Sequence, residues 1–184
     1  MKSKILLYIL LCLGLSLTSA GLHAQDRLSG VSFAAELGLP SGNFSNASNF
    51  GAGGSVKADL GISEKIALTA NAGYMVFFGR SAFRVKVPDF SYVPLKAGLK
   101  YFFTKDAFAE AQGGVALPAT GQNKMVYAWS PGFGTRFNVS SRSKMEVGIR
   151  YEGWTSRSQL ELANGQKLST RSFVGLRIGY FLPL

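Results

Sequence analysis

The feature that most constrains this chain is an alternation of apolar and polar residues with a period of two, which recurs eight times. Between residues 144 and 154, for example, Met145 and Val147 alternate with Glu146 and Gly148. Successive side chains of a β-strand point to opposite faces, so this period predicts strands with two unlike faces. The predicted strands span residues 30–39, 53–62, 66–76, 91–103, 107–117, 125–138, 144–154 and 171–182, and Pro131 predicts less regular pairing in the sixth.

The connections between these strands alternate in length. Long connections at 40–52, 77–90 and 155–170 and an intermediate one at 118–124 alternate with short polar ones at 63–65, 104–106 and 139–143. Such alternation is typical of membrane barrels with short periplasmic turns and longer external loops. Strands of about ten residues, tilted by ~40°, also match the ~25 Å apolar band of an outer membrane. We therefore expect an all-β fold, an eight-stranded antiparallel up-and-down transmembrane β-barrel.

The composition of the two strand faces indicates which one points outward. The apolar face contains no Asp, Glu, Lys or Arg in any predicted strand, and Tyr74, Trp129 and Tyr180 lie near its ends, where interfacial aromatic residues are expected. The opposite face combines charges of both signs with many glycines, which suits the narrow lumen of an eight-stranded barrel. We therefore expect the apolar face to meet lipid. A soluble exported barrel around an apolar core has the same period and is the alternative.

The charged face predicts a network inside the lumen. Its five acids and six bases are Glu36, Lys57, Asp59, Lys96, Lys100, Glu110, Arg136, Glu146, Arg150, Glu152 and Arg177. Buried charges are costly unless they are paired and hydrogen-bonded, so this near-balanced set favours a network that plugs the lumen. A narrow path for ions or protons is the alternative.

The amino-terminal residues have the pattern of an export signal. Lys2 and Lys4 precede an apolar run over residues 5–17, which is shorter than the ~20 residues of a membrane-spanning helix. We expect a signal peptide that is cleaved after Ala24, or alternatively after Ala20, because small residues stand near both positions. The predicted organisation is therefore a signal peptide over 1–24 and a barrel domain over 25–184.

Cleavage after residue 24 would leave a chain with little means of catalysis. It would remove the only cysteine, Cys12, and the only histidine, His23, and leave 18 Lys and Arg against 10 Asp and Glu. Without imidazole or thiol, a Ser-His-Asp site or a zinc site is not expected. Pairing in the lumen accounts for the carboxylates of Glu146 and Glu152, which are the remaining acid/base candidates. We expect no catalytic, cofactor-binding or metal-binding residues, and therefore no enzyme.

The basic residues favour contact with a membrane surface. Lys and Arg are dispersed rather than clustered, so nucleic acid is not expected as a partner, whereas outer-membrane lipid and lipopolysaccharide are. The residues expected to contact lipopolysaccharide phosphates are Arg80, Arg84 and Lys86, with Lys124, Arg157 and Lys167 in later loops. In the first loop, Phe44 and Phe50 are candidate contact points on a segment expected to be a solvated tip.

Four segments carry a resemblance to a known family, namely ELGLPSGNF (36–44), GGSVKADLGISEKIALTA (53–70), VPLKAGLKYFF (93–103) and RIGYF (177–181). On these segments the sequence resembles the OmpX-like class of small outer-membrane β-barrel domains, and the resemblance covers nearly all of residues 29–184. It implies an outer-membrane location in a Gram-negative bacterium and contact with the barrel-insertion machinery during biogenesis. In such families the last strand carries the insertion signal, and Arg177, Gly179, Leu182 and Leu184 fit its spacing, although Leu stands at the closing position where Phe is usual.

These observations predict a structural or surface-interaction protein, adhesive or envelope-stabilising, that acts through its external loops. One alternative is a conduit for small apolar molecules, as in OmpW-like barrels. Another is a lipid-modifying barrel enzyme, although barrels that trim or acylate lipid A rely on histidine, so the resemblance does not extend to them.

Overall fold

A computed structural model describes residues 28–82, 85–86, 88–119, 124–140, 143–161 and 167–184. For residues 81–82, 85–86, 157–161 and 167–169 it describes the backbone alone. The expected signal peptide lies outside the described residues, so its boundaries stay a prediction.

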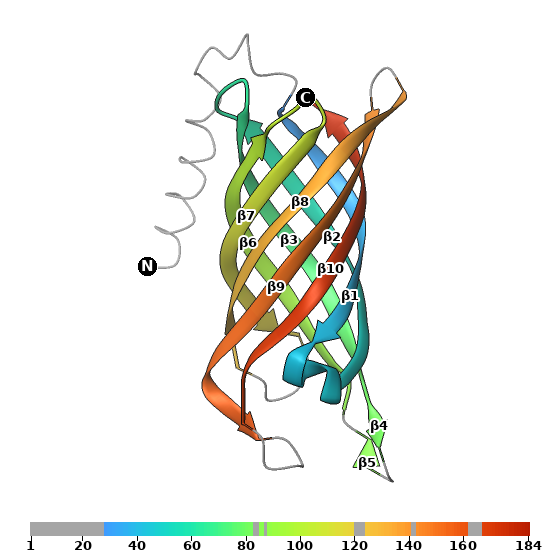
Figure 1. The fold of residues 1–184 in the computed structure, drawn as a ribbon, viewed down its shortest axis with the longest axis vertical. Coiled ribbons are helices and arrows are strands. Elements are labelled where there is room, and N and C mark those ends of the chain that lie inside the picture. Colours follow the sequence, from blue (N-terminus) through green and yellow to red (C-terminus); the bar gives the residue numbers. More distant parts are fainter. Residues whose placement is uncertain (1–27, 83–84, 87, 120–123, 141–142, 162–166) are drawn as a thin grey trace, which may run out of the picture.

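Eight strands form a closed barrel, as the alternation predicts (Figure 1). They are β1 (Gly30–Ser41), β2 (Ser48–Gly61), β3 (Ile66–Gly79), β6 (Phe90–Phe102), β7 (Ala107–Pro118), β8 (Val126–Ser140), β9 (Ser143–Glu161) and β10 (Lys167–Pro183). Each strand pairs antiparallel with its neighbours along the chain, and β10 closes the barrel against β1. The predicted eight-stranded up-and-down barrel is therefore confirmed.

The two ends of the barrel differ. The short connections between β2 and β3, between β6 and β7 and between β8 and β9 lie at one end, which we call the turn end, together with the carboxyl terminus (Figure 1). There the amide of Leu184 donates to the carbonyl of Ser29 at 3.2 Å, which holds the end of β10 beside the start of β1. The opposite loop end carries the short helix η1 (Gly42–Asn46) and the hairpin of β4 (Ser81–Ala82) and β5 (Val85–Lys86).

Among the described residues, no helix is long and apolar enough to cross a bilayer.

The closing register decides which side chains face the lumen. β1 and β10 pair without a bulge from Gly30 opposite Pro183 to Ser41 opposite Ser172. This register sets Glu36 opposite Arg177, and both side chains are buried inside the barrel. Because a slip of one residue would turn the side chains of the slipped strand to the other face, the burial of both charges excludes such a slip.

The apolar face of the strands forms the outer wall of the barrel. Phe33 is 55% exposed and Ile149 is 45% exposed, whereas Lys57 is 2% exposed and Lys100 is fully buried. Outward aromatic side chains also pair near the loop end, with ring centroids 4.7 Å apart for Phe50 and Phe78. The expected choice of faces is confirmed, because a soluble barrel would have these faces reversed.

The strands extend beyond their predicted ends at the loop end. β2 begins at Ser48 rather than at residue 53, and β9 and β10 continue through most of the connection predicted at 155–170. Outside the apolar band of a membrane, outward side chains need not be apolar, so the alternation fades while the backbone pairing continues.

Pro131 interrupts one of its two ladders. It pairs with Ala111 of β7. On the side of β9, the pairing is interrupted between Trp129, which lies opposite Gly153, and Gly132, which lies opposite Arg150, and it resumes in the same register. Proline has no backbone N–H to donate, so a break on one side is the expected compromise.

Candidate functional site in the barrel lumen

The lumen is filled in three layers. Charged side chains occupy the middle, and an apolar cluster closes each end. The loop-end cluster consists of Phe44, Ala47, Met75, Phe77, Tyr92, Ala116, Val126, Ala128, Trp154 and Phe173. The turn-end cluster consists of Ala67, Phe102 and Phe108, with Leu28 packed against it.

Glu146 on β9 is the centre of the charged layer. Its Oε1 lies 2.6 Å from Nζ of Lys57 and accepts a hydrogen bond from Nη1 of Arg177 at 3.0 Å. Its Oε2 accepts from Nζ of Lys100 and from Nε of Arg136, both at 2.9 Å. One buried carboxylate thus holds four cations from four other strands, an arrangement that compensates the cost of burying them.

Two further groups of charges join this centre. Asp59 accepts from Lys100 at 2.6 Å and also from Nη2 of Arg136, while Lys57 donates to Glu110 at 3.0 Å. These contacts tie strands β2, β6, β7 and β8 to Glu146.

The remaining charges lie nearer the loop end. Arg150 forms ion pairs with Glu36 and with Glu152, the latter at 2.6 Å, and Lys96 donates to the same Glu152 oxygen at 2.8 Å. Arg177 lies 3.6 Å from Glu36 and connects this group to Glu146. The structure therefore brings all eleven charged residues expected in the lumen into one continuous network, with members on every barrel strand except β3.

Aromatic rings cover the network at the turn end. Nζ of Lys100 lies 4.4 Å from the centroid of the Phe108 ring, and the Arg136 guanidinium lies 3.7 Å from that of Phe181. Cations over aromatic faces are stabilised, most strongly where water is excluded. The charged layer and the turn-end cluster are therefore one packed unit.

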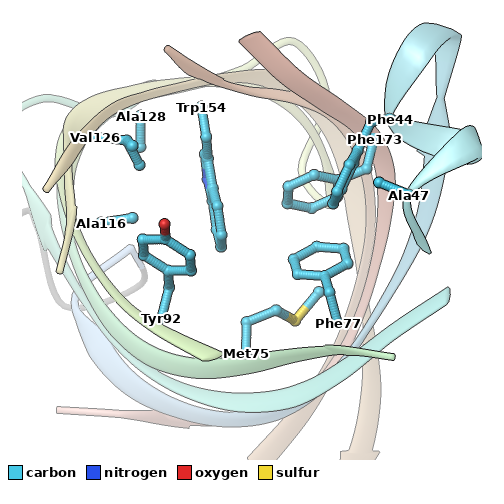
Figure 2. Packing of buried hydrophobic residues seen from close by; sticks show 10 residues of the cluster. All are labelled: Phe44, Ala47, Met75, Phe77, Tyr92, Ala116, Val126, Ala128, Trp154 and Phe173. Atoms are coloured by element: carbon cyan, nitrogen blue, oxygen red, sulfur yellow. The ribbon is translucent and has the colours of Figure 1, made fainter. Parts of the chain in front are cut away.

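At the loop end, aromatic side chains from several strands meet around Phe77 (Figure 2). The ring of Phe77 lies 4.9 Å from Phe173 and 5.5 Å from Trp154 in edge-to-face geometry, and Tyr92 packs on Trp154 at 5.1 Å. The indole N–H of Trp154 donates to Glu152 at 2.8 Å, so this cluster is hydrogen-bonded to the adjoining charged layer.

The first loop is anchored on the barrel through Phe44 and Ala47, whereas Asn43 and Asn46 are exposed, as expected of a solvated tip. Helix η1 carries Phe44 to within 5.1 Å of the Phe77 ring, and Phe44 is only 1% exposed. Its expected role as a contact point is therefore wrong, because its ring is used in packing. Phe50 is 46% exposed on the outer wall.

Sequence reasoning missed Arg171, a buried cation of the loop-end layer. Its Nη1 donates to the hydroxyl of Tyr92 at 2.7 Å, and its guanidinium lies 4.9 Å from the Phe90 ring centroid. The signal was present, because Arg171 has the same parity along β10 as Phe173 and Arg177, which point inward.

The basic residues expected to bind lipopolysaccharide are only partly described. Arg80 is exposed at the loop end, where its Nη1 donates to the carbonyl of Ser45 at 3.1 Å. Lys124 is exposed as well. Arg84 lies outside the described residues, and for Lys86 in β5, Arg157 in β9 and Lys167 in β10 only the backbone is described.

The expected insertion signal lies on the last strand and its end. Arg177 and Gly179 face the lumen, whereas Leu182 and Leu184 are exposed. Recognition by the insertion machinery stays a prediction.

Little space remains between the network residues. The cavity beside Lys57, Glu146 and Arg177 has a volume of about 30 Å³, the scale of a water molecule or two. Every carboxylate of the network already holds at least one cation. Within the described ranges, no three His, Cys, Asp or Glu side chains are grouped so as to hold a metal ion. The expected lack of catalytic, cofactor and metal sites stays a prediction.

Comparison with known proteins finds likeness in structure alone. No family model matches the sequence, and no curated protein is detectably similar to it. Among solved structures, Neisserial surface protein A (NspA) superposes with a TM-score of 0.57 at 16% identity, over 88% of this chain and 100% of that one. Ail, the attachment invasion locus protein of Yersinia pestis, gives 0.52 at 11% identity, over 85% and 97%. The outer membrane protein AlkL gives 0.51 at 14% identity, over 90% and 95%.

These similarities show a shared fold, that of the small eight-stranded outer-membrane barrels, and the expected OmpX-like architecture is confirmed. The outer wall of this barrel is apolar and its charges are enclosed. Fold and surface together place the chain in the outer membrane of a Gram-negative bacterium.

Proposed function

We propose that this protein is a closed, non-conducting barrel that acts through its loop end as a structural or surface-interaction component of the outer membrane. The observation that carries the proposal is the filled lumen, in which one charge network lies between two apolar clusters and leaves a cavity of about 30 Å³. A lumen that the described side chains fill this closely favours the plug over an ion path. A function in recognition would then reside at the loop end.

The loop end offers a firm platform for such contacts. The amide of Arg80 donates to the carbonyl of Ala47 at 3.1 Å, and Asp89 accepts from the amide of Gly79 at 2.9 Å. The first bond holds the first loop against the end of β3, and the second ties Asp89, just before β6, to the same strand end. A partner would therefore meet a surface that is preorganised at these positions. Lipopolysaccharide is the expected partner, through phosphates near Arg80 and Lys124, with Arg84 and Lys86 on the adjoining segment.

Uptake into liposomes tests the closed lumen. The folded protein is reconstituted, its folding is verified by gel mobility before and after boiling, and the entry of ions and of a small apolar dye is measured. We expect no flux above that of empty vesicles for either solute. Flux of the dye would replace this proposal with the conduit, and flux of ions would replace it with the ion path.

Binding to lipopolysaccharide tests the partner. We expect the double variant Arg80→Gln, Lys124→Gln to bind immobilised lipopolysaccharide more weakly than the wild type, and more so at low salt, because surface charges are screened as salt rises. Lys105→Gln at the turn end is the matched control. Equal binding by all three proteins would remove these loop residues from the proposal. Altered lipid A on overexpression would instead support a lipid-modifying enzyme.

A further inference from the structure

The turn end of the barrel contains a second, larger cavity. It has a volume of about 520 Å³, and Phe102, Phe103 and Arg136 contribute to its wall. Unlike the cavity inside the charge network, it is large enough for a small organic group. The short turns of such barrels face the periplasm, so this cavity lies at the level of the inner leaflet of the outer membrane.

Three lysines line the cavity, two from short connections at this end and one from the first residues of a strand. Lys65 follows β2, Lys105 follows β6, and Lys144 stands at the start of β9. Among the residues that the structure describes, Glu64 is the one acid that lines the cavity. In the part of the chain that the structure describes, none of the three ammonium groups forms an ion pair. Three segments far apart in the sequence thus bring three lysines and Arg136 to a cavity that Glu64 alone lines with an acid among the described residues.

Arg136 adds a buried cation with unused hydrogen-bonding capacity. The residue is 2% exposed, and its Nε and Nη2 donate to Glu146 and Asp59 inside the barrel. Its Nη1 has no hydrogen-bond partner among the described residues. A buried donor without an acceptor is costly. Because Arg136 also lines the cavity, its positive charge adds to the attraction for an anion there.

The wall of the cavity crosses from the lumen to the outside of the barrel. Phe102 points inward and is buried, whereas its neighbour Phe103 is 56% exposed on the outer wall. A ligand in this cavity therefore has basic groups on one side and hydrocarbon on the other. A free inorganic anion would use the lysines but not Phe103.

We propose that this cavity binds the head group of an anionic phospholipid of the periplasmic leaflet. The phosphate contacts Lys65, Lys105 and Lys144, Arg136 contributes charge from the cavity wall, and the acyl chains leave along Phe103. Free phosphate shares the head-group chemistry, and the apolar side of the cavity favours the lipid.

Native mass spectrometry of the folded barrel in micelles tests the proposal. Phosphatidylglycerol is titrated against a background of phosphatidylcholine, and the apparent Kd is measured for the wild type and for Lys65→Gln, Lys105→Gln, Lys144→Gln combined. We expect the Kd to rise about fivefold for each lysine removed, or roughly 100-fold for the triple variant. The single variants and Lys124→Gln at the loop end are the controls, and the latter should bind like the wild type. These lysines form no ion pairs among the described residues, so the folded state should persist and is checked by gel mobility.

Three results would overturn the proposal. The triple variant could bind phosphatidylglycerol as tightly as the wild type, which would remove the lysines from the site. Phosphatidylcholine could bind equally well, which would leave only apolar contact. Inorganic phosphate or glycerol phosphate could displace the lipid at equal concentration, which would assign the cavity to a soluble anion.

Discussion

Replacing Glu146 by glutamine should destabilise the barrel more than any other single loss of charge in the lumen. Its carboxylate lies 2.6 to 3.0 Å from four cations, and the substitution leaves four acids against six bases in the network. Removing one partner of a buried ion pair costs about 3–5 kcal/mol. The glutamine amide oxygen can still accept one or two of the hydrogen bonds, so we expect a loss of about 4 kcal/mol, or roughly 10³ in the folding equilibrium.

Two further variants with smaller expected losses of stability serve as comparisons. Among the described residues Glu110 forms an ion pair only with Lys57, and it also accepts a hydrogen bond from Gln112 at 2.7 Å. Its side chain is 14% exposed, so Glu110→Gln should cost about 2 kcal/mol. Glu64 is exposed on a turn, and Glu64→Gln should change stability by less than about 0.5 kcal/mol. Urea unfolding in micelles, followed by tryptophan fluorescence and gel mobility, gives the free energy of unfolding by linear extrapolation. If Glu146→Gln came within 1 kcal/mol of Glu64→Gln, about the spread expected of surface substitutions, the central role of Glu146 would be refuted.

Three pairs of substitutions, each a test and its control, are compared in the same unfolding assay. Ile149→Arg places a charge on the lipid-facing wall and should cost about 2–4 kcal/mol, whereas Ile149→Leu should be tolerated. Phe44→Ala should cost about 3–5 kcal/mol because the ring is buried in the loop-end cluster, and little change in Phe44→Ala relative to Phe50→Ala would contradict that packing. Gly114→Ala should cost about 1–3 kcal/mol because its Cβ would meet the main chain of β6, whereas the Cβ of Gly113→Ala meets nothing within 4 Å. Equal effects at the two glycines would show that the wall is looser than described.

The sequence predicts the strands and their faces well because the membrane imposes the pattern. Every residue on the outer wall of the apolar band must tolerate lipid, so the alternation holds from Val31 to Leu39 and again from Met145 to Tyr151. The same constraint separates charged from apolar side chains so strictly that the eleven network residues can be assigned to the lumen by parity alone.

The alternation does not reveal the two apolar clusters. Where the lumen itself is apolar, both faces of a strand look alike, as at Phe77 and Phe78, which point inward and outward. The buried rings of Tyr92 and Trp154 were missed for this reason, because the inward face was expected to be polar. Residues an even number of positions apart on a strand share a face, so counting from a neighbouring charge would have assigned both rings to the lumen. Trp154, for example, follows Glu152 by two residues.

The sequence also does not predict which cations share a given carboxylate. Lys57 and Glu146 are 89 positions apart, and their contact depends on the tilt of the strands and on the closing register of β1 with β10. A near balance of charge predicts pairing but not the convergence of four cations on Glu146.

The orientation of the strand faces can be measured directly, because the chain has two tryptophans on opposite faces. Trp129 is 41% exposed on the outer wall, and Trp154 is 1% exposed in the lumen. In vesicles of lipids brominated on the acyl chains near the head group, the fluorescence of Trp154→Phe, which retains Trp129, should be strongly quenched. The fluorescence of Trp129→Phe, which retains Trp154, should be nearly unaffected. Strong quenching of Trp154 with protection of Trp129 would contradict the assignment of the apolar face to lipid and of the charged face to the lumen.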